Sequence, residues 1–129
     1  METAASGTEG GKIKTLTLSL KKQWFDLIKA GVKKEEYREN SEFWRKRLVD
    51  EISLVREFNS TKDSKMTCGE LTKKHIRKFD KLVFTLGYPK AGDTERRLEF
   101  KNPRIQTGKG RTEWGAEYGK QYFIITWEA

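Results

Sequence analysis

The run GVKKEEYR at residues 31–38 constrains the fold most, because it combines a helix-stop signal, a strand signal and a cluster of charges. Gly31 follows a segment with apolar residues at helical spacing, and glycine readily adopts the positive φ that ends a helix. Side chains alternate in the strand that we expect next, so Glu36 and Arg38 share one face. Lys33 has the wrong parity for that face, and we expect it in the turn, reaching back over the pair.

The segments before this run predict a leader, a strand and a helix. Residues 1–11 are small, polar and rich in glycine, which is typical of a disordered leader. Residues 13–20 alternate between apolar and polar side chains and predict a strand. Residues 21–30 place aromatic and aliphatic side chains at helical spacing and predict a short helix.

Two further helices are expected after the charged run. Asn40 or Ser41 can cap the first of them. Residues 67–70 match a capping box for the other, which we expect to reach about Lys78. The apolar stripe of the first would consist of Trp44, Leu48, Ile52 and Val55.

The C-terminal half is dominated by strand signals. Residues 81–88 and 96–101 predict strands, and Pro103 demotes the second to an edge strand or a bulge. Residues 108–120 form a glycine-rich loop, and residues 121–128, apolar on both faces, predict a buried final strand. We therefore expect an α+β fold: a small, mixed or antiparallel β-barrel, closed or nearly closed, with two to three helices packed outside.

The size and charge of the chain point to one domain and a polyanionic partner. Its 129 residues suit a single domain over residues 12–129. A net charge of +8 and a pI of about 9.6 favour nucleic acid, with a cationic surface of no specific partner as the alternative.

The cysteine, histidine and hydropathy patterns bear on compartment and cofactors. Cys68 is the single cysteine, and the sequence has neither a long apolar run nor a secretory signal, so we expect a cytoplasmic protein without membrane association. His75 is the single histidine and leaves no ligand set at a useful spacing, so we expect no metal and no organic cofactor.

Residues 18–38 resemble the start of ASCH domains, which are small relatives of the PUA-type RNA-binding barrels. The family signature is Gly-x-Lys-x-x-Glu-x-Arg, and Gly31, Lys33, Glu36 and Arg38 match it. Residues 80–88 and 113–125 are also similar to the family, and residues 53–71 match least. The resemblance implies a β-barrel in which this motif lines a cleft. It also implies binding of RNA or of a modified nucleotide, because similar proteins bind or act on RNA or acetylated cytidine.

Each residue of the motif has a functional and a structural interpretation. Lys33, as a mobile point charge, would neutralise a phosphate, polarise a carbonyl or act as a base; otherwise it is an ordinary solvated lysine. Glu36 would read a base edge while Arg38 holds a phosphate, or the two pair as a structural salt bridge. In the acetylcytidine-hydrolysing relatives the position that matches Glu36 carries a hydroxyl, so this chain departs from that pattern.

Other basic and aromatic residues are candidates for contact with nucleic acid. Trp114, flanked by Gly115, is a candidate platform for base stacking, whereas Trp24 and Trp127 are assigned to the core. The exposed face with Arg45, Lys46 and Arg47 is interpreted as solvated. Besides the motif, the candidate nucleic-acid-binding residues are Lys34, Tyr37, Arg104, Lys109, Arg111 and Trp114.

Three hypotheses follow for the function of the chain. In the first, it binds RNA or a nucleotide in a basic cleft, as a monomer. In the second, it is a hydrolase of RNA or of a modified nucleoside, with Lys33 as base and Glu36 as its acid–base partner. In the third, its basic face docks an acidic protein.

Overall fold

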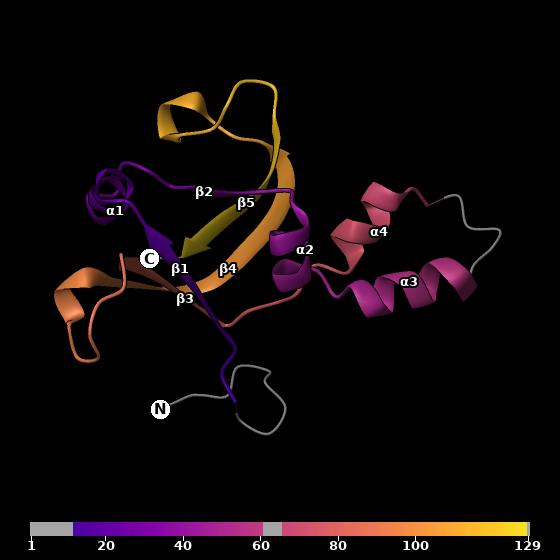
Figure 1. The fold of residues 1–129 in the computed structure, drawn as a ribbon, viewed down its shortest axis with the longest axis horizontal. Helices are drawn as coiled ribbons and strands as arrows, with labels where there is room; N and C mark the ends of the chain where they lie inside the picture. Colours follow the sequence, from indigo (N-terminus) through magenta and orange to yellow (C-terminus); the bar gives the residue numbers. More distant parts are fainter. Residues whose placement is uncertain (1–11, 61–65, 129) are drawn as a thin grey trace. The chain divides into compact units, whose positions relative to one another are not determined.

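The computed structural model describes residues 12–60 and 66–128 and has an α+β fold (Figure 1). The predicted leader, residues 1–11, lies outside the described residues. In chain order the elements are β1 (Thr15–Leu20), α1 (Lys22–Lys29), β2 (Glu36–Glu39), α2 (Glu42–Leu48), α3 (Glu51–Ser60), α4 (Cys68–Lys74), β3 (Lys81–Leu86), η2 (Thr94–Arg96), β4 (Arg97–Lys109), η3 (Thr112–Trp114) and β5 (Gln121–Glu128).

The strands form one five-stranded mixed sheet in the order β1-β3-β4-β5-β2. β1 pairs in parallel with β3, so that Leu18 lies opposite Phe84, and β3 pairs antiparallel with β4, so that Phe84 lies opposite Leu98. This confirms the α+β class with a mixed sheet. In the strand order of the described residues, β1 and β2 stand at the two ends.

The chain divides into two compact units. The described residues of the first are 12–36, 78–104 and 125–128, and those of the second are 37–60, 66–77 and 105–124. The single predicted domain thus contains two clusters of internal contacts.

The core of the first unit lies on β1, β3 and α1. The predicted alternation in β1 is confirmed, since its leucines are buried and the residues between them are exposed. β3 is buried at four successive positions, as expected for a strand covered on both faces. Phe84 stacks edge-on against Trp127 with ring centroids 5.0 Å apart, and Trp127 itself is half-buried rather than fully in the core. Helix α1 packs against β3 and buries Phe25 and Ile28.

The expected continuous helix from residue 42 to about 55 is wrong, because α2 ends at Leu48 and α3 begins at Glu51. Val49 between them has extended backbone and pairs with Ile76. The Leu48 carbonyl accepts from the Arg77 amide at 2.8 Å. Backbone pairing with the segment after α4 therefore outweighs helix continuation, and Ile52 and Val55 end up 72% and 52% exposed instead of forming a buried stripe.

The predicted caps of α2 and α4 are confirmed. The Ser41 hydroxyl accepts from the Trp44 amide at 3.4 Å, and Thr67 and Glu70 form a reciprocal capping box. α4 ends at Lys74, short of the expected Lys78, because the residues after it pair with the α2–α3 connection.

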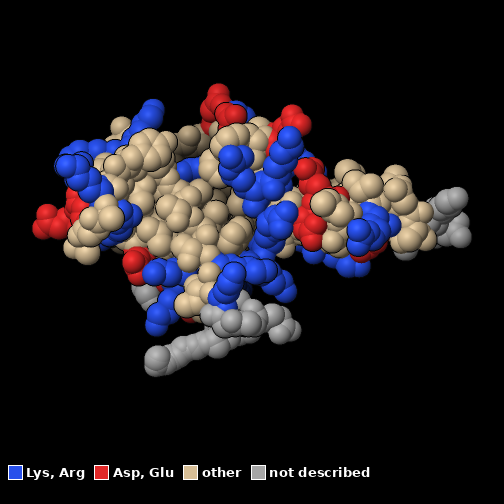
Figure 2. All heavy atoms as spheres, turned by 60° about the horizontal axis from the view of Figure 1, so that its bottom comes forward, with Lys and Arg blue, Asp and Glu red and all other residues tan. Residues whose placement is uncertain are grey.

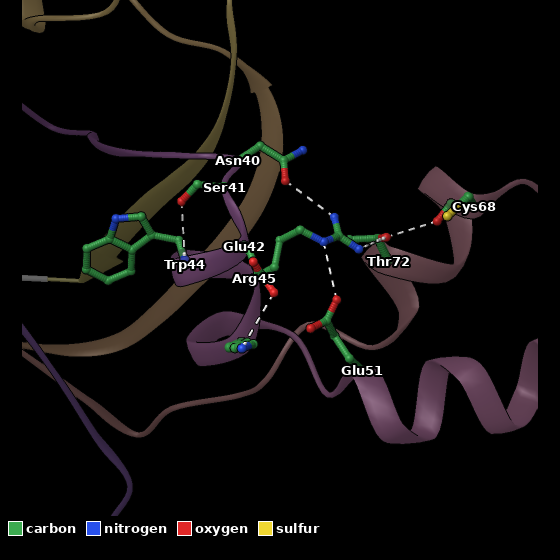
Figure 3. A network of polar contacts seen from close by, with 9 residues as sticks. Asn40, Ser41, Glu42, Trp44, Arg45, Glu51, Cys68 and Thr72 are labelled. Atoms are coloured by element: carbon green, nitrogen blue, oxygen red, sulfur yellow. Dashed lines mark hydrogen bonds and ion pairs between the residues drawn. The ribbon is translucent and has the colours of Figure 1, made fainter.

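Arg45 connects the three helices of the second unit (Figure 3). Its guanidinium donates to Thr72 Oγ1 on α4 and to Glu51 Oε2 on α3, each at 3.4 Å. It also donates to Asn40 Oδ1 before α2 at 3.3 Å. These contacts fix the ends of α2, α3 and α4 relative to one another. Arg45 is therefore not the solvated charge that the sequence predicts.

Pro103 lies past Lys101, the last residue of β4 that pairs with β3, which agrees with the predicted edge or bulge. It lies within β4, which stands between β3 and β5 in the sheet. The irregularity falls on the preceding residue, because Asn102 has φ of 47° in the left-handed region, which asparagine tolerates better than most residues. The final strand β5 is confirmed, with Phe123 and Ile125 fully buried.

Candidate functional site

The loop that carries Lys33 is positioned by the end of α1. Gly31 has φ of 79°, and no described atom lies within 4 Å of where its Cβ would be, so backbone conformation alone favours glycine. Its amide donates to the Ile28 carbonyl at 3.0 Å, and the Val32 amide donates to the Leu27 carbonyl at 2.9 Å, which is a Schellman motif. The Lys33 amide donates to the same Leu27 carbonyl at 3.1 Å. The helix end therefore sets the position of the Lys33 backbone.

Lys33 and Glu36 form a buried ion pair. Lys33 Nζ lies 2.8 Å from Glu36 Oε1, and the two side chains are 1% and 6% exposed. The ammonium also lies 4.3 Å from the ring centroid of Trp24, which is within cation–π range. Trp24 is half-buried, rather than the core residue that we expected. α1 thus supplies the ring, the following loop supplies the cation, and the first residue of β2 supplies the carboxylate.

The burial of the pair changes the chemistry available to Lys33. A lysine that is 2% exposed is not the mobile surface cation that we expected, and it does not meet a phosphate chain that stays on the surface. Lysine and glutamate are almost never fully buried unless they are paired. Removing one partner of a buried pair costs about 3–5 kcal/mol. Neither partner can therefore be removed alone without a large loss of stability, whatever role the pair has toward a ligand.

Arg38 and Lys34 lie beside the pair in sequence. Lys34 is exposed in the loop before β2. Arg38 belongs to the second unit, where its Nη1 donates to the Tyr37 carbonyl at 2.9 Å. Its guanidinium carbon lies 5.2 Å from the ring centroid of Trp44. The structure thus brings Lys33 and Glu36 together and holds Arg38 against an aromatic ring.

Tyr37 packs against the glycine-rich loop of residues 108–120. It is 8% exposed and packs with Ala116 and Tyr122, and its hydroxyl accepts from the Arg111 amide at 2.9 Å. A Cβ on Gly110 would lie 2.7 Å from Ala116 Cβ and 2.8 Å from the Tyr37 ring, so only glycine fits this close approach. Tyr37 therefore fixes the shape of the loop and does not offer its face to a ligand.

The surface of this loop carries an arginine–tryptophan pair. The Arg111 guanidinium lies 5.1 Å from the ring centroid of Trp114, which is half-buried. Lys109 is exposed at the end of β4, and Arg104 is exposed further back on β4, in the first unit. The structure therefore places Arg111 against the half-buried Trp114 ring.

Lys120 has a role that the sequence did not reveal. Its Nζ lies 2.9 Å from Glu39 Oε1 and 3.1 Å from Glu117 Oε2. These two hydrogen bonds raise the pKa of the Lys120 ammonium above its ordinary value. A firmly cationic Lys120 ties the base of the loop to the end of β2.

The sequence interpretation also missed Phe43, Trp44 and Arg47. Phe43 is 54% exposed, and the Arg47 guanidinium lies 3.5 Å from its ring centroid. The available signal was the spacing, since residues four apart on a helix are neighbours and Phe43 precedes Arg47 by that interval. We had interpreted Arg47 as part of a solvated face.

Among residues 12–60 and 66–128, no group of three or more His, Cys, Asp or Glu side chains is placed to hold a metal ion. Within this described part of the chain, no helix has the length and apolar character needed to cross a membrane.

The chain was compared with known proteins by sequence and by structure. No protein-family model, no curated protein and no solved structure matches it.

Proposed function

We propose that this chain is a PUA-like ASCH domain that binds RNA or a modified nucleotide at the Lys33–Glu36 pair. The observation that carries the proposal is the buried 2.8 Å contact between these two side chains beside the Trp24 ring. An ammonium, a carboxylate and an indole next to one another offer a donor, an acceptor and a stacking surface. These are the groups with which proteins recognise an unstacked base.

The charge of the chain supports the same class of ligand. A net charge of +8 attracts polyanions, and Lys and Arg side chains gather in groups on the face drawn in Figure 2. The spacing of Gly31, Lys33, Glu36 and Arg38 matches the ASCH signature. Closure of the five-stranded sheet into a PUA-like barrel and a cytoplasmic location belong to this proposal.

The burial of the pair limits the size of the ligand group. Since Lys33 is 2% exposed, the group that reaches it is a single base or nucleoside that inserts, not a phosphate chain passing over the surface. Exposed cations of the same unit, among them Lys34 and Arg104, would contact the phosphates outside.

A second candidate function is hydrolysis of RNA or of an N-acylated nucleoside. The 2.8 Å hydrogen bond between Lys33 Nζ and Glu36 Oε1 favours it, because proton transfer between a base and its acid–base partner requires such a distance. Turnover of acylated cytidine that is lost in the more stable Lys33→Met/Glu36→Leu, followed by mass spectrometry of the products, would select this function. Recovery of intact substrate selects binding alone.

The binding test compares two double variants with equal charge. Lys33→Met/Glu36→Leu removes the buried pair, and Lys22→Met/Asp26→Leu removes an exposed pair on α1 that is 75% and 51% exposed. Each loses one positive and one negative charge, so long-range attraction is unchanged. We expect the first variant to bind a labelled single-stranded RNA or a modified nucleoside at least about tenfold more weakly, equivalent to ~1.4 kcal/mol.

The control variant should bind like the wild type. Equal affinities for both variants would refute the assignment of the ligand to Lys33 and Glu36. Absence of any nucleic-acid or nucleoside affinity at low salt would refute the proposed function and favour docking of an acidic protein.

A further inference from the structure

Four side chains of the second unit form a continuous row of two neighbouring rings with a cation at each end. The Arg38 guanidinium lies 5.2 Å from the Trp44 ring centroid, and the Trp44 ring meets Phe43 edge-on with centroids 5.1 Å apart. The Arg47 guanidinium lies 3.5 Å from the Phe43 ring centroid. We call Arg38, Trp44, Phe43 and Arg47 the cation–aromatic row.

Both arginines of the row donate hydrogen bonds to backbone carbonyls. Arg47 Nη1 donates to the Phe43 carbonyl at 3.0 Å, and Arg38 Nη1 donates to the Tyr37 carbonyl at 2.9 Å. The Ser41 cap fixes the first turn of α2, from which Phe43 and Trp44 project.

The two sides of α2 have different roles. Figure 3 shows Trp44 and Arg45 leaving the helix in opposite directions, and Arg45 is directed toward α3 and α4. Arg45 is engaged by Glu51 and Thr72, so it belongs to the packing of the helices. The row therefore lies on a side of α2 that the contacts between the helices do not use.

The row is exposed to solvent mainly at its Phe43 and Arg47 end. Phe43 is 54% exposed, Arg47 is exposed, and Trp44 and Arg38 are half-buried. The two acidic residues that adjoin the row in sequence each have a lysine beside them. Glu39 Oε1 lies 2.9 Å from Lys120 Nζ, and Glu42 Oε1 lies 3.6 Å from Lys46 Nζ. The surface thus combines exposed aromatic area with net positive charge.

We propose that the cation–aromatic row binds a single nucleic-acid strand, whose bases stack on Phe43 and Trp44 while Arg38 and Arg47 contact the flanking phosphates. Stacking of bases on aromatic side chains within a positive groove is how single strands are bound with little sequence preference. The bases of a duplex are already stacked on each other, so a duplex has no free base face to place on Phe43 or Trp44. The inference rests on the proposed function only for the class of ligand, since the row shares neither Lys33 nor Glu36.

The test measures binding of a labelled single-stranded RNA of about 12 nucleotides by fluorescence anisotropy. Phe43→Ala removes one stacking ring, and Phe58→Ala, on α3 and 61% exposed, is its matched control. Loss of one base stack is worth ~1–3 kcal/mol, so we expect Phe43→Ala to bind roughly 5- to 150-fold more weakly and Phe58→Ala to bind like the wild type.

A second pair of variants separates charge from stacking. Arg47→Gln should reduce the slope of log affinity against log salt by ~0.7, as expected for one lost phosphate contact of a single strand. Arg47→Lys should keep the slope and still lose affinity, because the ammonium lacks the planar guanidinium. Arg56→Gln, an exposed charge on α3, controls for net charge.

Four results would overturn the inference. The first is equal affinity of Phe43→Ala and Phe58→Ala with the nucleoside affinity of the Lys33–Glu36 pair intact, which leaves the proposed function standing. The second is equal binding of a duplex, and the third is displacement of the RNA by a poly-glutamate peptide at lower concentration than by unlabelled RNA. The fourth is that the wild type binds no strand at all. This result would refute the inference and would also exclude RNA as the ligand in the proposed function.

Discussion

Removal of Lys33 alone should destabilise the protein far more than removal of an ordinary lysine. Lys33→Met keeps most of the side-chain length and deletes the charge, so Glu36, at 4% exposure, keeps its carboxylate without this cation. Breaking a buried pair in this way costs about 3–5 kcal/mol. That is a large fraction of the ~5–15 kcal/mol by which a domain is stable.

Urea denaturation followed by circular dichroism measures this effect. With an m-value of ~2 kcal/mol per molar urea, the loss lowers the midpoint by roughly 2 M. Lys22→Met is the control, because Lys22 Nζ lies 2.6 Å from Asp26 Oδ2 and the pair is largely exposed. An exposed i,i+4 pair contributes only ~0.5 kcal/mol despite its shorter distance. The difference between the two losses of stability therefore comes from the burial of the ion pair and not from its N–O distance.

The double variant Lys33→Met/Glu36→Leu tests whether the loss of stability in Lys33→Met comes from the remaining Glu36 carboxylate. Replacing both charges by apolar side chains removes the buried carboxylate together with its cation, so most of the stability lost in Lys33→Met should return. A midpoint for Lys33→Met that equals that of Lys22→Met would refute the reasoning. So would a double variant no more stable than Lys33→Met.

Three further predictions concern backbone geometry, packing and pH. Gly31→Ala should destabilise by ~1–2 kcal/mol in urea titration, because a side chain at φ of 79° is strained; an unchanged midpoint would contradict this. Gly110→Ala should lower the melting temperature through a loss of ~1–3 kcal/mol, since its Cβ would meet a tyrosine ring at 2.8 Å, and a wild-type melting curve would argue against that packing. Hydrogen bonds from Lys74 and His75 lower the pKa of Glu57 below its ordinary 4.5, so its stabilising contribution is complete above pH 4.5 and is lost as the pH falls below it. Glu57→Gln should flatten the stability profile in that acid range, whereas a profile identical to the wild type would exclude this contribution.

The local elements could be predicted because their signals lie within a few residues. Gly31 after an amphipathic segment predicted the end of α1, and residues 67–70 predicted the cap of α4, since both depend on local backbone bonds. The alternating leucines of β1 predicted its buried face.

The break between α2 and α3 depends on distant residues and was missed. Val49 leaves the helix because it pairs with Ile76, and helical spacing in the sequence contains no trace of that partner. One local signal was available, since Asp50 caps α3 by accepting from the Ser53 amide at 3.2 Å.

The contact between Lys33 and Glu36 was predicted from the sequence, and its burial was not. The spacing of Lys33 and Glu36 suggested that the two converge, and they lie 2.8 Å apart. Charge alone suggested a solvated lysine, whereas Lys33 is 2% exposed. Burial of a charge is set by the elements that pack around it, which sequence periodicity does not describe.

An NMR titration of the ¹⁵N-labelled chain with a single-stranded RNA or a modified nucleoside tests the central claim most directly. The chain has four tryptophans, and each gives its own indole N–H signal. Among the described contacts, the Trp24 ring is the one that lies against Lys33. We predict that the Trp24 indole and the Lys33 and Glu36 amides shift together as the ligand saturates. Saturation with all three signals unmoved would contradict a ligand site at the buried pair.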